Sequence, residues 1–210
     1  MLWMCCNVEI NTWWRMKEKL NVLCYSHEGF NDYMRMKGWY EKPGLGTATI
    51  SICSPNDEDP VHWFPESYFG DNIIRENINL DFDDIDPSRY WDDDAYDRLF
   101  SQFMDFDPIL AHSENEYRFD APTAPTGIVR AMTYEEAFKV VYFIDREIKL
   151  GAKNIIIHCS AGISRSQGIV RYILDTYGDT YDIVTREDNP CITPNYHVVR
   201  MLKRVNRLLK

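Results

Sequence analysis

A cysteine and an arginine lie at the two ends of a short loop, in a pattern that can hold an anion beside a nucleophile. Cys159 and Arg165 are separated by Ser160, Ala161, Gly162, Ile163 and Ser164. The apolar residues 155–157 before them predict a short buried strand, and the residues from Gln167 onward predict a helix. Loop N–H groups at the start of a helix, together with its positive dipole end, favour a phosphate dianion. The loop is therefore predicted to bind phosphate over the cysteine.

The side chains of this segment suit nucleophilic catalysis. A helix N-terminus and a nearby guanidinium both favour the thiolate, so Cys159 is expected to be a nucleophile at neutral pH. Arg165 carries a planar fork of donors that can hold two phosphate oxygens and stabilise the charge of the transition state. The Ser166 hydroxyl can donate a hydrogen bond to the sulfur when the sulfur leaves a phosphocysteine intermediate.

One segment resembles the signature of the cysteine-dependent protein tyrosine phosphatases. It consists of His158 and Cys159, then five residues, then Arg165 and Ser166. The short flanks are most similar to the dual-specificity branch. The resemblance implies an α/β fold whose central, mostly parallel sheet is flanked by helices. It implies hydrolysis of phosphate monoesters on phosphotyrosine and phosphoserine/threonine proteins, with no metal and no cofactor. It also implies that His158 orients the loop through hydrogen bonds.

The reaction also needs a carboxylic acid that protonates the leaving group and later acts as the base on water. Residues 73–86 begin as a strand and end in a cluster of aspartates. In the resembled family the acid is an aspartate on a loop after a strand, and this segment is most similar to that pattern with Asp84 as the acid. Asp83 is the second candidate. Asp81, Phe82 and Asp83 also faintly resemble the nucleophile of magnesium-dependent haloacid-dehalogenase phosphatases, a mechanism that loss of activity in EDTA would reveal.

Asp84 lies further from Cys159 in the sequence than the acid of the family usually does. An insertion at about residues 86–127, before the catalytic loop, would account for the separation. Asp120 remains an alternative acid because it is nearer to the cysteine, although no strand pattern precedes it. The insertion is acidic and directly follows the candidate acid, so we expect it to lie beside the active-site mouth and to favour phosphopeptides with basic flanks.

Length and composition predict one domain. The chain of 210 residues is 45% hydrophobic and can bury one good-sized core. The expected domain covers residues 21–210, preceded by an N-terminal extension at residues 1–20. If translation began at Met16 instead of Met1, the domain would lose little, because the first strand pattern begins at Asn21.

Charge and cysteine usage limit the partners and the compartment. The net charge of −10 weighs against a nucleic-acid partner, whose binding needs a basic patch. Neither a membrane-spanning apolar run nor a secretion signal is recognisable, so we expect a cytoplasmic protein. The six cysteines form no C-x-x-C pair and no zinc-ligand spacing, which favours free thiols in a reducing compartment. The sequence leaves open whether Cys53 or Cys191 can form a protective disulfide with Cys159, and it leaves the oligomeric state open.

Other segments predict the supporting elements. Strands are expected at residues 21–25 and 47–53, and a helix at 26–37. A capping box at Thr133 begins a further amphipathic helix that ends before Gly151. The last helix begins near Asn195, whose side chain either caps this helix or supports the phosphate loop from behind.

Two other functions are compatible with the same residues. An RNA 5′-triphosphatase or a phosphoinositide phosphatase could use the same scaffold, although the loop lacks the additional lysines that lipid phosphatases of this superfamily tend to carry. A non-catalytic phosphoprotein-binding module would result if the acid were absent or misplaced.

Overall fold

The computed structural model describes residues 17–37, 46–54, 76–84, 116–117, 129–186 and 193–210. Five strands form a parallel sheet in the order β3-β2-β6-β1-β7. These strands are β1 (Glu18–Ser26), β2 (Thr47–Cys53), β3 (Glu76–Asp81), β6 (Asn154–Cys159) and β7 (Tyr181–Val184). Two short strands, β4 (Glu116–Tyr117) and β5 (Val129–Arg130), pair antiparallel in a separate sheet.

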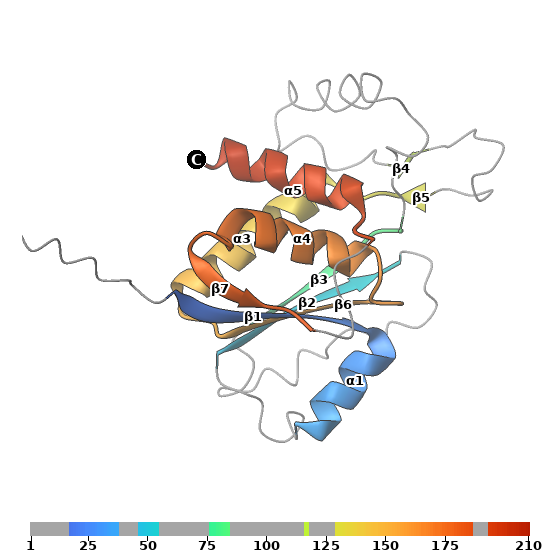
Figure 1. The fold of residues 1–210 in the computed structure, drawn as a ribbon. Helices are drawn as coiled ribbons and strands as arrows, with labels where there is room; N and C mark the ends of the chain where they lie inside the picture. Colours follow the sequence, from blue (N-terminus) through green and yellow to red (C-terminus); the bar gives the residue numbers. More distant parts are fainter. Residues whose placement is uncertain (1–16, 38–45, 55–75, 85–115, 118–128, 187–192) are drawn as a thin grey trace, which may run out of the picture.

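Helices cover both faces of the parallel sheet. They are α1 (His27–Met36), α3 (Tyr134–Lys149), α4 (Arg165–Tyr177) and α5 (Tyr196–Leu208). Figure 1 shows α3, α4 and α5 on one face of the sheet and α1 on the other. A parallel sheet that is covered on both faces has apolar strands, and every residue of β2 is buried. The α/β fold predicted from the sequence is confirmed.

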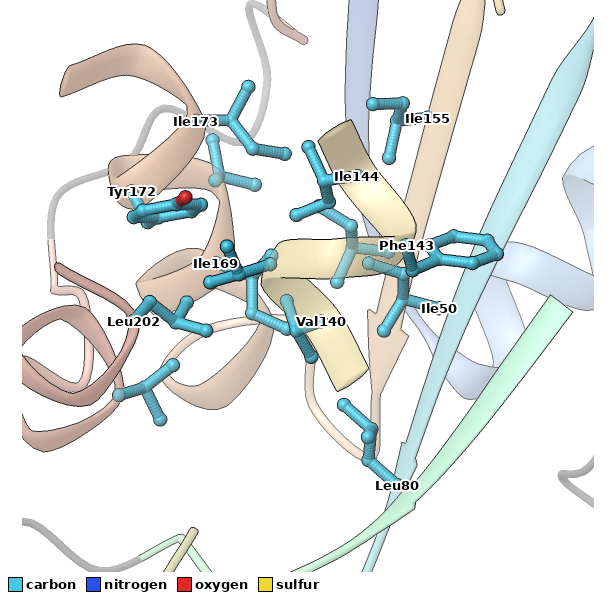
Figure 2. Close-up of a cluster of buried hydrophobic side chains, with 14 of the residues drawn as sticks. Ile50, Leu80, Val140, Phe143, Ile144, Ile155, Ile169, Tyr172, Ile173 and Leu202 are labelled. Carbon is cyan, nitrogen blue, oxygen red and sulfur yellow. The ribbon is translucent and has the colours of Figure 1, made fainter. Parts of the chain in front are cut away.

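The alternation of side chains along β6 divides the interior into two clusters. Ile155 and Ile157 belong to the large core under α3, α4 and α5, whereas Ile156 packs with Phe30 and Met34 of α1. Figure 2 shows the large core, with labelled side chains from the sheet (Ile50, Leu80, Ile155), from α3 (Val140, Phe143, Ile144), from α4 (Ile169, Tyr172, Ile173) and from α5 (Leu202). His158 and Cys159 continue the alternation, so the cysteine lies on the face of the large core.

The predicted helix starts are confirmed by their caps. In the capping box of α3, the N–H of Glu136 donates to Thr133 Oγ1 at 3.1 Å, and the N–H of Thr133 donates to Glu136 Oε2 at 2.8 Å. Ser26 accepts the N–H of Gly29 at 3.0 Å at the start of α1. These bonds satisfy N–H groups that the first helical turn leaves without an intrahelical partner.

Some boundaries differ from the sequence-based expectation. β1 begins at Glu18, earlier than the expected strand, because its first residues pair with β7 through Glu18 and Tyr181. β7 itself was not anticipated. Three parts of the sequence-based expectation lie outside the described residues. They are the chain up to residue 16, Asp120, and the expected insertion apart from residues 116–117. The domain organisation therefore stays a prediction. In the described part of the chain, no helix has the length and apolar character needed to cross a membrane.

Candidate active site

The proposed site residues gather where the parallel strands end. Cys159 is the last residue of β6, Ser54 follows β2, and residues 82–84 follow β3. These three strands are neighbours in the sheet, so their carboxyl ends lie at one edge. This edge of an open α/β sheet is where ligands usually bind.

Cys159 forms the floor of the loop and is only 2% exposed. Its Sγ lies 3.1 Å from Ser166 Oγ, in the first turn of α4. The backbone N–H of Gly162 donates to the same sulfur at 3.3 Å. A hydroxyl and an amide N–H directed at one sulfur can stabilise negative charge on it.

The loop requires glycine at position 162. Gly162 has φ +70°, which L side chains rarely adopt, and an added Cβ would lie 2.5 Å from Ser26 N and from the carbonyl carbon of Tyr25. The loop therefore packs directly on the backbone at the end of β1. The N–H of His27 also donates to the Ser160 carbonyl at 3.3 Å, so the start of α1 holds the other side of the loop.

Arg165 is 4% exposed and connects three chain segments. Its Nη1 donates to the Phe82 carbonyl at 2.7 Å and to Ser54 Oγ at 2.9 Å. Its Nη2 donates to Ser160 Oγ at 3.0 Å. The buried Nε has no hydrogen-bond partner among the described residues. The guanidinium thus joins the ends of β2 and β3 to the loop and keeps one donor available.

The structure brings Asp84 to the rim of the loop. Asp84 Oδ1 accepts hydrogen bonds from Ser164 Oγ at 2.6 Å and from Asn195 Nδ2 at 3.0 Å. The side chain of Asp84 is exposed. Of the alternatives, Asp83 is the neighbouring residue and Asp120 lies outside the described residues.

Asn195 caps α5 with its side chain and contacts the loop with its backbone. Its Oδ1 accepts the N–H of Val198 at 3.2 Å, which caps α5. Its backbone N–H donates to the Ser164 carbonyl at 3.1 Å, and its side-chain amide holds Asp84. One buried residue therefore connects the start of α5, the phosphate loop and the candidate acid.

His158 is held by β2 and α1. Its Nε2 lies 2.7 Å from Ser51 Oγ, and its ring stacks on Phe30 with centroids 4.0 Å apart. The resemblance implied hydrogen bonds by which His158 orients the loop, and the bond observed here goes to β2. Its partner was not predicted, because Ser51 comes close only through the pairing of β2 with β6.

Sequence reasoning also missed Cys24, a buried thiol behind the loop. Its Sγ lies 3.0 Å from Ser166 Oγ and 3.3 Å from the Gly162 carbonyl. The residue type gave no signal, since the contact depends on β1 lying beside β6. No disulfide joins Cys24, Cys53 and Cys159 to one another, and Cys191 lies outside the described residues. Nowhere in the described ranges do three or more His, Cys, Asp or Glu side chains group so as to hold a metal ion.

Comparison with known proteins finds similarity over part of the chain. The chain is 32% identical over 110 residues to a probable rhodanese domain-containing dual specificity protein phosphatase of Dictyostelium discoideum. It is 40% identical over 77 residues to dual specificity protein phosphatase 8 of Homo sapiens. The chain is a distant relative of dual-specificity phosphatases. The matches cover 22% of the first protein and 12% of the second, and no family model matches the chain.

Proposed function

We propose that this relative of the dual-specificity phosphatases is itself a metal-independent phosphatase. It hydrolyses phosphate monoesters of phosphotyrosine and phosphoserine/threonine proteins through a phosphocysteine intermediate. The observation that carries the proposal is the meeting of Cys159, Arg165 and Asp84 at one edge of the sheet, around a loop whose N–H groups suit an anion. In this proposal residues 21–210 form a single phosphatase domain, with an insertion at about 86–127.

In the first step, the Cys159 thiolate attacks phosphorus. A bond from sulfur to phosphorus forms as the bond from phosphorus to the leaving oxygen breaks. The loop N–H groups and the guanidinium of Arg165, including its available Nε, hold the phosphoryl oxygens. Asp84 gives its proton to the departing alkoxide or phenoxide. Because Oδ1 already accepts two hydrogen bonds, the proton is carried on Oδ2.

In the second step, water hydrolyses the phosphocysteine. Asp84, now a carboxylate, takes a proton from the attacking water, and the phosphorus–sulfur bond breaks to release inorganic phosphate. The electron pair of that bond returns to Cys159. Ser166, 3.1 Å from the sulfur, donates a hydrogen bond to the thiolate that forms.

The names of the relatives and the composition of the loop support the proposed substrate class. Both relatives are named dual specificity protein phosphatases, which supports phosphoprotein substrates. The loop residues Ala161, Ile163 and Ser164 supply no cation beyond Arg165. One guanidinium and a set of N–H groups suit a single phosphate monoester better than a polyphosphate.

The test is hydrolysis of p-nitrophenyl phosphate by the wild-type chain and by Cys159→Ser, with EDTA present. Loss of at least about a thousandfold in kcat is expected for Cys159→Ser, because the hydroxyl is a far weaker nucleophile. Cys53→Ser is the matched control, since Cys53 is a buried thiol at the end of the neighbouring strand β2. An unchanged rate for Cys159→Ser would contradict the mechanism.

A substrate panel then tests the class. Phosphotyrosine and phosphothreonine peptides, RNA 5′-triphosphate and inositol phosphates are compared by phosphate release. Preference for the phosphopeptides is expected, and preference for either of the other two would contradict the proposed substrate class.

A further inference from the structure

A buried thiol that the proposed mechanism does not use lies directly behind the phosphate loop. Cys24, on β1, is 3% exposed and shares a face of the strand with the core residues Leu20 and Val22. Its Sγ is directed at Ser166 Oγ, at 3.0 Å, and the same hydroxyl lies 3.1 Å from Cys159 Sγ. Ser166 therefore lies between two sulfurs, one behind the loop and one in its floor.

The protonation state of Cys159 decides the direction of these hydrogen bonds. A thiolate has no proton to donate, so Ser166 must be the donor in its contact with Cys159. The oxygen of Ser166 can then accept, and a thiol is a weak hydrogen-bond donor. The S–H of Cys24 is placed to donate to it. The three groups form a chain in which each donates toward the nucleophile.

Cys24 also contacts a second acceptor, which competes with Cys159 for the proton of the Ser166 hydroxyl. The hydroxyl of a helical serine often donates to the carbonyl four residues earlier, which for Ser166 belongs to Gly162. Cys24 Sγ contacts this carbonyl too, at 3.3 Å. The thiol has one proton, so it donates either to Ser166 Oγ, which supports the productive direction, or to this carbonyl, where it competes with the Ser166 hydroxyl for the acceptor.

We propose that Cys24 is a positioning residue of the reaction, whose thiol directs the Ser166 hydroxyl toward the sulfur of Cys159. The inference rests on the proposed function, because it names what keeps the serine in its role. Cys24 stabilises the Cys159 thiolate through Ser166, both before attack and when sulfur leaves the phosphocysteine. An alanine or valine on this strand face would pack in the core but could not donate.

The test distinguishes the loss of a hydrogen-bond donor from the loss of packing in the core. Cys24→Ser keeps a donor, whereas Cys24→Ala and Cys24→Val remove it with smaller and larger side chains. Val22→Ala is the control for lost packing, because Val22 lies on the same strand and in the same core but away from the loop. The readout is the rate of iodoacetamide alkylation of Cys159 at about pH 6 divided by the rate at about pH 9, which follows the thiolate fraction. Mass spectrometry of tryptic peptide 154–165 assigns the reaction to Cys159.

The ratio is expected to fall by up to about tenfold in both Cys24→Ala and Cys24→Val, because the Ser166 hydroxyl can then turn away and the thiolate loses the hydrogen bond from Ser166. In Cys24→Ser and Val22→Ala it stays within about twofold of wild type. The kcat for p-nitrophenyl phosphate falls in parallel with the ratio while KM is unchanged, since the contact acts on the nucleophile. Two apolar variants of different size allow a result even if one of them does not fold.

An unchanged ratio in the apolar variants would overturn the positioning role, and so would an equal fall in Cys24→Ser or in Val22→Ala. Alkylation does not require turnover. A wild-type chain that is inactive on p-nitrophenyl phosphate would therefore contradict the proposed function, while the alkylation ratios would still decide the role of Cys24.

Discussion

The two oxygens of Asp84 have different surroundings. Oδ1 accepts the Ser164 hydroxyl and the Asn195 amide. Both donors come from residues that also hold the phosphate loop, since the Ser164 carbonyl accepts the N–H groups of Gly168 and Asn195. The position of the candidate acid is thus coupled to the position of the phosphate loop. Effective proton transfer requires this, because the acid must reach the leaving oxygen.

Replacing Asp84 by a residue that cannot donate an acidic proton tests its role directly. Asp84→Asn keeps the size of the side chain and is expected to lower kcat for phosphotyrosine peptide by about a hundredfold or more, as loss of a general acid does. The loss should be smaller for a phosphate ester whose leaving group needs no protonation. Asp83→Asn and Asp120→Asn are the controls, and stopped-time assays of phosphate release provide the measurement. A larger loss of kcat in either control would show that this other aspartate, and not Asp84, is the general acid.

The amide of Asn195 can be tested separately from its helix cap. Asn195→Asp retains an N-cap oxygen for the Val198 N–H but places a like charge beside Asp84. Asp84 then loses a hydrogen-bond donor and gains a repulsive neighbour, so kcat for phosphotyrosine peptide should fall by about tenfold. Asn195→Ser, which keeps a cap without the charge, should lower kcat less. An unchanged kcat in both variants would show that this contact does not act on the acid.

At the scale of elements, α4 and α5 are joined by one carboxylate. Asp175 of α4 accepts from Lys203 of α5 at 2.6 Å, and Arg171 lies 2.9 Å from it one turn earlier. Partial burial alone would raise the pKa of Asp175, but the hydrogen bonds and charges of Lys203 and Arg171 outweigh burial and lower it. The pair is open to solvent, so its contribution to stability is small.

The lowered pKa of Asp175 predicts how the stability contribution depends on pH. A carboxyl group with a lower pKa in the folded chain stabilises it above the unfolded value of 3.8, and this stability is lost as pH falls through the folded value. Asp175→Asn should therefore cost about 0.5 kcal/mol at neutral pH and less at an acid pH at which the folded carboxyl group is protonated. Urea unfolding at both pH values measures this. Asp182→Asn, an exposed carboxylate on β7, is the control, and an equal cost for Asp175→Asn at both pH values would contradict the ion-pair origin.

Elements with strong local signals were predicted well from the sequence. The bounds of β2 follow from a run of small and β-branched residues that alternate between polar and apolar, and the start of α3 follows from Thr133 and Glu136 at capping-box spacing. β7 (Tyr181–Val184) was missed because it is a short edge strand whose residues are only partly buried, so it shows no clear alternation. Its existence depends on pairing with β1, which is a tertiary contact.

The difference between local signals and tertiary contacts also applies to the candidate site. Cys159, Arg165 and Ser166 were recognised because they are adjacent in the chain and their spacing is set by local loop geometry. The contacts of His158 with Ser51 and of Ser166 with Cys24 join residues 107 and 142 positions apart. Only the order of strands in the sheet brings these residues together, and that order could not be derived from the periodicity of one chain.

At the scale of the whole molecule, the excess of acidic residues acts on the approach of substrate. The chain carries 33 Asp and Glu against 23 Lys and Arg, a net charge of −10. Such a charge attracts cationic peptides and repels anionic ones over distances of about 10 Å at moderate salt. The acidic run Asp92, Asp93 and Asp94 lies outside the described residues and adds to this charge.

We therefore expect kcat/KM at about 0.05 M salt to be roughly tenfold higher for a phosphopeptide with basic flanks than for one with acidic flanks. At about 0.5 M salt the difference should shrink to about twofold, because screening removes long-range steering but leaves contacts at the phosphate intact. p-Nitrophenyl phosphate, which has no flanks, is the reference for general effects of salt. Replacing Asp92, Asp93 and Asp94 together by Asn should reduce the preference at low salt if the insertion lies beside the active-site mouth. A preference that is insensitive to salt would instead indicate direct contacts between the flanking residues and the protein.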